Sequence, residues 1–258
     1  MSQPPVPARR TDPDRSETLD LPRPGVEGPP RPHDSEVPDH RPRKSVEADR
    51  VDRPVAPGIV LTSFDTFGRT GWMRVHVLNA DLGDESVGVD LVAGKVSDAR
   101  ALTQLSDAQH AVAAVNGDYF NITETNAAEG PEIQNGTLRK GAVQPSTVAA
   151  IGADRIARLA DLMITGTVTV ADAQRPLAAL NSATVPADSI AAFTPLWGPG
   201  DRTLIHDGGP YTELVVVNGK VVSVESKLTD TAVPDDGLIV LGRGTPRGNW
   251  PPPSRATP

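Results

Sequence analysis

The sequence has no cysteine, few aromatic residues and no long hydrophobic run. Without cysteine among its 258 residues, the chain has no disulfide, no thiolate metal ligand and no cysteine nucleophile. Because aromatic residues make up only 3% of the chain, its core must be built mainly from valine, alanine, leucine and isoleucine. A membrane span needs about 18 consecutive apolar residues. No such run occurs, so the sequence predicts no membrane span.

Positive charge is also scarce. The chain has 25 lysine and arginine residues against 33 aspartate and glutamate residues, which gives a net charge of −8. This charge repels a polyanion, and no basic run typical of nucleic-acid binding occurs, so we expect no nucleic-acid partner. No two of the five histidines have ligand spacing, and no regular calcium-loop pattern is present. We therefore predict no metal site, and the sequence identifies no cofactor.

Proline is abundant near the two ends of the chain. Residues 1–57 combine many prolines with mixed charges and no aromatic side chain, so they cannot bury enough apolar surface to offset the entropy of ordering. We predict a disordered tail over residues 1–57, a folded region over residues 58–243 and a second disordered tail over residues 244–258. The first ten residues are proline-rich and no apolar stretch follows them, so the printed start has no signal-peptide pattern.

The folded region is predicted to be a strand-rich α+β fold. Short β-branched and apolar runs predict strands at residues 59–64, 72–78, 87–92, 111–115, 162–170 and 237–241. Hairpins are expected at residues 72–92, 147–159 and 211–224, the last around Asn218-Gly219, which takes the positive φ angles of a tight turn. Ser97 as an N-cap, followed by apolar residues three positions apart, predicts one helix that ends near His110. The expected architecture is a mixed sheet with at least one packed helix.

Polar residues follow the predicted buried strand at residues 111–115. Asn116, Gly117 and Asp118 come directly after it, and we expect Phe120 to be buried beneath them. Polar side chains at the end of a buried strand lie at a sheet edge on a rigid base, which is typical of a functional site. Asn-Gly-Asp after a strand is also an ordinary turn. Both interpretations stay open at this point.

The residues around this segment resemble the phosphodiester glycosidases, a family related to the lysosomal enzyme that uncovers mannose 6-phosphate by removing N-acetylglucosamine. Members carry an apolar strand, then Asn-Gly-x-Phe or Asn-Gly-x-Phe-Phe, then a loop with a fixed glycine, then a turn of the form Asp-Gly-Lys. The counterparts here are residues 112–115, residues 116–120, Gly130 and residues 135–137. Residues 54–64 and 189–197 are similar to the bacterial branch of the family, and the likeness extends over residues 55–241.

The resemblance implies a glycoside hydrolase that cleaves the bond between C1 of a sugar and a phosphodiester. Because the phosphate leaves as a stable anion, the main tasks are to stabilise an oxocarbenium-like transition state and to hold the phosphate. We expect Asp118 and Asn116 to be catalytic. The residues expected to bind substrate are Gly117, Gly130, Glu129 and Arg139. Glu124 and Glu132 on the sugar side and Lys140 near the phosphate are further candidates, although each glutamate also fits a solvated loop.

Two motifs of the family have no counterpart in the sequence, the Arg-Thr-Ala-x-Gly-like strand and the Asn-Leu-Asp-Gly-Gly-Gly-Ser-like loop. Residues 201–210 imitate parts of both, but Asp207-Gly208-Gly209 lacks the third glycine and the serine, so we interpret this segment as a variable connection. We therefore expect a catalytic domain that is incomplete at its C-terminal end and weakly active or inactive. The alternative is a non-catalytic, β-rich carbohydrate-binding or surface module. The localisation stays unknown from the sequence; the resemblance implies a secreted or cell-envelope protein if the start of the chain is misassigned.

Overall fold

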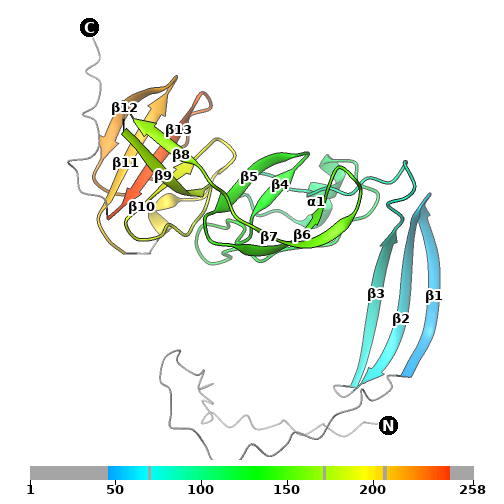
Figure 1. The fold of residues 1–258 in the computed structure, drawn as a ribbon. Coiled ribbons are helices and arrows are strands. Elements are labelled where there is room, and N and C mark those ends of the chain that lie inside the picture. Colours follow the sequence, from blue (N-terminus) through cyan, green and yellow to red (C-terminus); the bar gives the residue numbers. More distant parts are fainter. Residues whose placement is uncertain (1–45, 69–70, 171–172, 206–207, 245–258) are drawn as a thin grey trace, which may run out of the picture. The chain divides into compact units, whose positions relative to one another are not determined.

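The computed structural model describes residues 46–68, 71–170, 173–205 and 208–244, and within them the fold is mostly β (Figure 1). The helical elements in these residues are the seven-residue helix α1 (Leu102–Ala108) and the short 3-10 helix η1 (Arg202–Leu204). The expectation of a strand-rich fold with mixed sheets and a helix is confirmed, with little helix content. In the described part of the chain, no helix has the length and hydrophobicity needed to cross a membrane.

A three-stranded antiparallel sheet comes first along the described chain. It is formed in the order β1 (Val46–Ala56), β2 (Ile59–Gly68) and β3 (Gly71–Ala80). Strands β2 and β3 pair without interruption from Ile59 opposite Ala80 to Gly68 opposite Gly71. On one face Arg74 donates two hydrogen bonds of 2.7 Å to the Asp65 carboxylate. This sheet is therefore a regular meander with polar cross-strand contacts.

An eight-stranded mixed sheet makes up most of the remaining structure. Its strand order is β12 (Lys220–Glu225), β11 (Tyr211–Val217), β13 (Gly237–Arg243), β10 (Ser189–Phe193), β9 (Ala173–Leu180), β5 (Thr137–Ala142) and β4 (Glu132–Gln134), with β8 (Thr167–Val170) also paired to β9. Strands β9 and β10 run parallel, and the other pairs are antiparallel. Strands β6 (Ser146–Ile151) and β7 (Ala157–Leu162) form a separate antiparallel pair.

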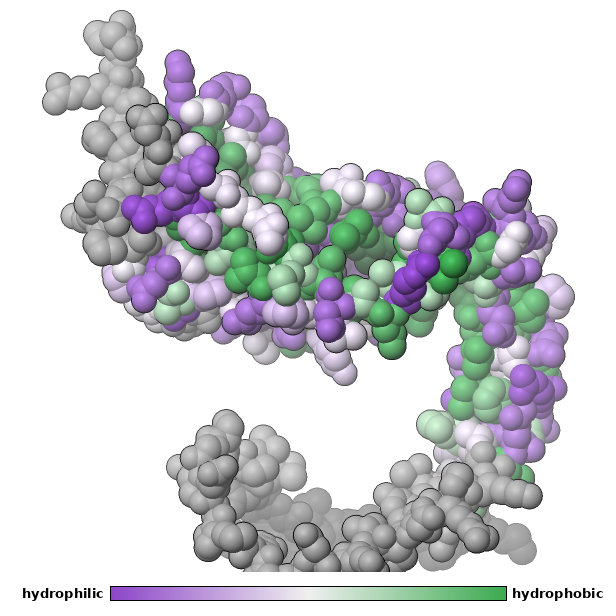
Figure 2. All heavy atoms as spheres, viewed as in Figure 1, coloured by the Kyte–Doolittle hydropathy of each residue, from purple (hydrophilic) through white to green (hydrophobic). Residues whose placement is uncertain are grey.

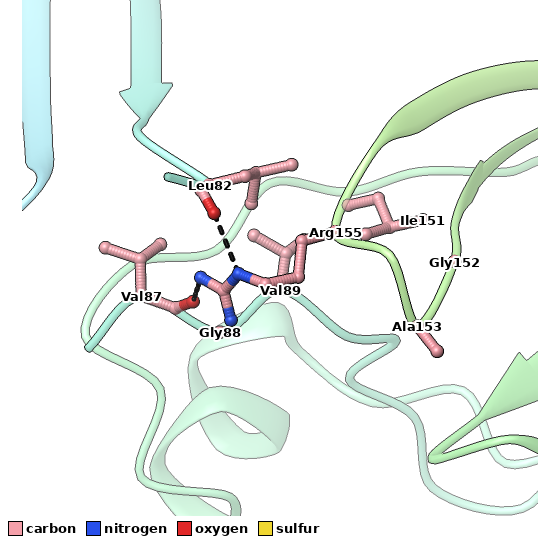
Figure 3. A pocket seen from close by; sticks show the side chains of 8 residues that line it. All are labelled: Leu82, Val87, Gly88, Val89, Ile151, Gly152, Ala153 and Arg155. Carbon is pink, nitrogen blue, oxygen red and sulfur yellow. Dashed lines mark hydrogen bonds between the residues drawn. The ribbon is translucent and has the colours of Figure 1, made fainter. Parts of the chain in front are cut away.

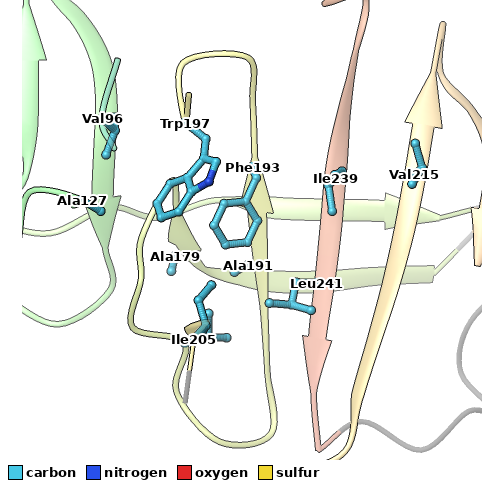
Figure 4. Packing of buried hydrophobic residues seen from close by; sticks show 11 residues of the cluster. Val96, Ala127, Ala179, Ala191, Phe193, Trp197, Ile205, Val215, Ile239 and Leu241 are labelled. Atoms are coloured by element: carbon cyan, nitrogen blue, oxygen red, sulfur yellow. The ribbon is translucent and has the colours of Figure 1, made fainter. Parts of the chain in front are cut away.

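The core lies against the central strands of the eight-stranded sheet (Figure 4). Phe193 and Trp197 are fully buried, and their rings meet edge to face with centroids 5.0 Å apart. Ile239 and Leu241 of β13 are also fully buried beside them. The small side chain of Ala191 on β10 lies in the same cluster and leaves room for these larger side chains, so a chain poor in aromatics concentrates two of them in one place.

A buried ion pair lies beside this core. The Arg202 guanidinium donates to Glu213 Oε1 at 2.6 Å and to the Thr231 carbonyl at 2.7 Å. Both side chains are almost completely buried. The backbone N–H of Thr229 donates to Glu213 Oε2 at 2.7 Å, so the pair ties η1 and the 229–231 segment to β11. Residues 201–205 are thus part of the packed structure and not a loose connection.

Three predictions about the chain between residues 46 and 115 are wrong. Strand β1 covers residues 46–56, so the predicted disordered tail cannot extend to residue 57; residues 1–45 and 245–258 lie outside the described residues. Residues 87–92 form no strand, and β3 pairs with β2 instead. Residues 111–115 form no buried strand, and Val115 is 75% exposed. An apolar run becomes a strand only where a neighbouring strand supplies hydrogen bonds, and none does so for these two segments in the described structure.

The predicted helix is present but starts later than expected. Helix α1 begins after Ala101, whose side chain makes no capping hydrogen bond. Ser97, the expected N-cap, is instead buried and donates from Oγ to the Trp197 carbonyl at 2.6 Å. The Ser97 hydroxyl, which the local pattern assigned to the helix N-terminus, therefore binds a carbonyl that is distant in the sequence.

The predicted hairpins in the C-terminal part are confirmed. Strands β6 and β7 pair in register, and β11 and β12 meet at Asn218 and Gly219, whose φ angles are +49° and +73°. The predicted last strand is β13. The predicted strand at residues 162–170 is shorter than expected, since only residues 167–170 form β8. Asn135 and Gly136 also form a turn, between β4 and β5.

Candidate functional site

Residues 118–130 form a closed loop. The backbone N–H of Glu129 donates to the Tyr119 carbonyl at 2.9 Å, and the N–H of Asn121 donates to the Ala127 carbonyl at 2.9 Å. Phe120 and Ala128 face each other in an isolated antiparallel bridge between these two hydrogen bonds. The two ends of the loop therefore lie side by side, which brings Asp118 close to Gly130.

Asp118 closes the base of this loop. Its Oδ1 accepts a hydrogen bond of 2.7 Å from the N–H of Tyr119, and its Oδ2 accepts one from the N–H of Gly130. A Cβ atom at position 130 would overlap Oδ2, so any side chain there would displace the carboxylate from this position. A carboxylate has about four lone-pair positions, and two of them are used. Asp118 is thus exposed and oriented, with acceptor capacity left over.

Lys140 binds the same part of the backbone, at Glu129 and Gly130, through its carbonyl groups. This lysine is only 3% exposed, and its Nζ donates to the Glu129 carbonyl at 2.5 Å and to the Gly130 carbonyl at 3.0 Å. The peptide group between Glu129 and Gly130 therefore gives its N–H to Asp118 and its C=O to Lys140. We call this arrangement of Asp118, Lys140 and the Glu129–Gly130 peptide the peptide clamp.

A second pair of charges lies next to the clamp on strands β4 and β5. Glu132 is the cross-strand partner of Lys140, and its Oε2 is 3.5 Å from Nε of Arg139. Arg139 is buried and donates to Gln134 Oε1 at 2.8 Å and to the Gly94 carbonyl. Burial raises the pKa of Glu132, while Arg139 opposes the shift. Burial also lowers the pKa of Lys140, and the Glu132 carboxylate acts against this change.

The loop is anchored to the core of the eight-stranded sheet through Ser97. Its N–H donates to the Trp197 carbonyl at 2.8 Å, and its Oγ accepts from the N–H of Gly200 at 2.7 Å. The neighbouring Val96 carbonyl accepts from Ala128 in the loop at 3.2 Å. Sequence reasoning missed this anchor, because nothing in the local pattern links residue 97 to a residue one hundred positions later.

The remaining predicted site residues are not all gathered at the clamp. Asn116 and Gly117 are exposed in the coil before Asp118. Glu124 accepts from Asn121 Nδ2 at 2.8 Å at the far end of the loop. Phe120, expected to be buried, is 43% exposed, so that prediction is wrong. The buried Arg139 head bonds to protein groups, and its contact with a substrate stays a prediction.

One hollow of about 210 Å³ lies away from the clamp, between the 82–89 segment and the β6–β7 turn (Figure 3). Arg155 in its wall donates to the carbonyls of Leu82, Asp84 and Val87 at 2.7–2.8 Å. Its guanidinium is therefore used to join these two segments. Among the described residues, no group of three or more histidine, aspartate or glutamate side chains could hold a metal ion.

Comparisons with known proteins identify a fold but no family. No family model and no curated protein matches the sequence. A hypothetical protein from Synechocystis is similar in structure, with a TM-score of 0.63 and 19% identity over 79% of this chain and 39% of that chain. A Burkholderia pseudomallei protein described as exported has a TM-score of 0.53 and 15% identity over 79% of this chain and 65% of that chain. The chain thus spans less than two thirds of either protein, and likeness at this identity concerns the fold alone.

Proposed function

We propose that residues 116–140 carry part of a phosphodiester glycosidase-like site, which binds a sugar-1-phosphodiester and acts on the bond from sugar C1 to the phosphate oxygen. The observation that supports this proposal most is the peptide clamp. It fixes an exposed carboxylate, Asp118, with two backbone donors while leaving it lone pairs for a ligand. Preorganised groups of this kind stabilise charge that develops in a transition state.

In this proposal Asp118 faces the sugar. The oxocarbenium-like transition state is positively charged near C1, and a fixed carboxylate stabilises it without having to reorient. The leaving phosphodiester is a stable anion and needs little help from a general acid. Asn116 and the N–H of Gly117, both exposed beside Asp118, are the donors that we assign to the phosphate.

Lys140 has an indirect role in this proposal. Its ammonium group is buried and bonded to two carbonyls, so it is not a group that meets the phosphate. It positions Gly130 and, through Gly130, the carboxylate of Asp118. Because the family's Gly-Gly-Gly-Ser-like loop has no counterpart in the sequence, we expect slow hydrolysis by this chain.

The test is hydrolysis of the methyl diester of N-acetylglucosamine 1-phosphate by the full chain. We expect Asp118→Asn and Asn116→Ala each to lower the rate by about a hundredfold, the effect of losing one preorganised polar group. Asp154→Asn is the matched control, since Asp154 is also an exposed carboxylate that accepts from a backbone N–H, but it lies at the β6–β7 turn. Equal rates in all three variants and the parent would contradict the assignment.

A second candidate function is a non-catalytic carbohydrate-binding module. The ring of Tyr119 is 81% exposed directly beside Asp118, which favours binding because sugars pack their C–H faces on exposed aromatic rings. Under this alternative, the chain binds the diester, Tyr119→Ala weakens binding, and no hydrolysis is detected in parent or variant.

A further inference from the structure

The two edges of the three-stranded sheet differ in a way that bears on association between chains. Strand β1 has breaks in its pairing with β2 between Ala48 and Val51 and between Pro54 and Ala56. Asp49, in the first break, has a φ of +53°. Bulges, proline and charge are the means by which proteins prevent edge strands from pairing with other chains. The β1 edge is therefore protected.

Strand β3 has neither a bulge nor a proline, and it carries little charge. It pairs with β2 over ten consecutive positions with no irregularity, contains no proline, and carries one arginine and one histidine in ten residues. Every second residue of such a strand points its N–H and C=O away from β2. Among the described residues, β3 pairs only with β2, so this row of backbone groups is open to another strand.

The side chains of β3 are unusually apolar for an exposed edge. Trp72 and Met73 are 65% and 57% exposed, and Val77 and Leu78 are exposed as well. Trp72 and Leu78 lie on one face of the strand, and Met73 and Val77 lie on the other. Figure 2 shows hydrophobic residues at the surface along this sheet. Hydrophobic surface of this kind marks an interaction site.

We propose that two copies of this chain pair through β3 in antiparallel orientation, with Val75 of each copy opposite Val75 of the other, and so form a six-stranded sheet. A two-fold axis perpendicular to a sheet places residues of the same face opposite each other. With the axis at Val75, Trp72 lies opposite Leu78 and Met73 lies opposite Val77 of the second copy. Apolar side chains thus meet apolar side chains on both faces.

The neighbouring symmetric registers fit less well. An axis at Arg74 places two arginines directly opposite each other, and like charges in that position destabilise a strand pair. An axis at His76 places Met73 opposite Asn79 and Arg74 opposite Leu78. In the register centred on Val75, Arg74 lies opposite His76, and its charge is already matched by the bidentate bond to Asp65 in its own sheet.

The absence of cysteine gives a sharp test of this register. In the full chain, Val75→Cys places two thiols opposite each other on the axis, within the Cα separation that a disulfide requires. Under mild oxidation we expect a covalent dimer of Val75→Cys, and none of Met73→Cys or Val77→Cys alone. A mixture of the Met73→Cys and Val77→Cys chains should cross-link, because these positions face each other between copies. Val51→Cys, exposed on the protected β1 edge, is the matched control and should stay monomeric.

Sedimentation of the unmodified chain provides a measurement that does not depend on any variant. We expect the mass to rise from monomer to dimer as the concentration of the chain increases. Met73→Lys should raise the concentration at the midpoint of dimerisation at least tenfold, and Val51→Lys should leave it unchanged. A chain that stays monomeric at every concentration would overturn the proposal. This holds both if residues 1–45 pair with the β3 edge and if nothing pairs with it. Cross-linking of Val51→Cys as fast as Val75→Cys would overturn it too.

Discussion

The eight-stranded sheet and the segment that carries the peptide clamp are held in place by different kinds of interaction. The sheet has a dry core in which Phe193, Trp197 and Leu241 are fully buried. Residues 87–135 contain only one short helix and one short strand; they contribute Val96 and Ala127 to the same core, and hydrogen bonds to residues outside the segment hold much of their backbone. Ser97, Arg139 and Lys140 make these bonds. Hydrophobic burial thus builds the support, and hydrogen bonds to backbone groups shape the site.

This difference predicts that the largest losses of stability come from the sheet. Phe193→Ala removes a fully buried ring that packs on Trp197, and we expect it to lower the free energy of unfolding by about 4 kcal/mol. The measurement is urea unfolding followed by circular dichroism. Tyr119→Ala removes an exposed ring near the clamp and should change the same quantity by less than about 0.5 kcal/mol. Similar losses in the two variants would contradict the comparison.

The anchor between the two regions should give the next largest effect. Ser97→Ala removes the hydroxyl that bonds to the Trp197 carbonyl and the Gly200 N–H, and leaves each of these backbone groups with one partner fewer. We expect a loss of about 2 kcal/mol in the free energy of unfolding. Ser86→Ala, which removes an exposed hydroxyl bonded to Asp84, serves as the control and should be close to neutral. An equally small effect of Ser97→Ala would show that the anchor lies elsewhere.

A smaller and more local loss is expected at the clamp. Gly130→Ala places a methyl group against Asp118, so the carboxylate must leave the Gly130 N–H, at a cost of about 1 kcal/mol. In combination with Asp118→Ala, the two losses should sum to more than the loss in the double variant, since both break one contact. Gly117→Ala, with no atom near the added methyl group, should be tolerated. Full additivity would argue against the clamp.

The smallest effect is a dependence on pH at Glu132. Because burial raises its pKa in the folded state, the fold binds this proton more tightly than the unfolded chain does. The stability from this proton is fully present below the ordinary pKa of 4.5 and is lost as the pH rises through the higher pKa of the folded state. Glu132→Gln removes this titration. The free energy of unfolding of the variant, relative to that of the parent chain, should therefore rise as the pH increases through this window. A constant difference between the two chains across the window would contradict the assigned shift.

The sequence allowed the sheet to be predicted much better than the site. The turn at Asn218-Gly219 and the apolar strand at β13 are local signals, and both were placed correctly. The apolar run at residues 111–115 failed, because a strand depends on a neighbour that a local pattern does not reveal. Asp118 and Gly130 were chosen together only through the resemblance to a family. Lys140 was predicted to lie near the phosphate, but the folded loop brings two carbonyls to its buried ammonium group, and these take up its hydrogen bonds.

The central claim is that the loop held by the clamp binds a sugar-1-phosphodiester, and a titration followed by amide chemical shifts tests it most directly. The methyl diester of N-acetylglucosamine 1-phosphate is added to the full ¹⁵N-labelled chain and to Lys140→Met, in which the buried donor is lost. We expect saturable shifts at the amides of residues 116–130, with those of β11 as an unchanged internal reference, and binding at least tenfold weaker in the variant. Unchanged amides at residues 116–130, or equal affinity of both chains, would contradict the claim.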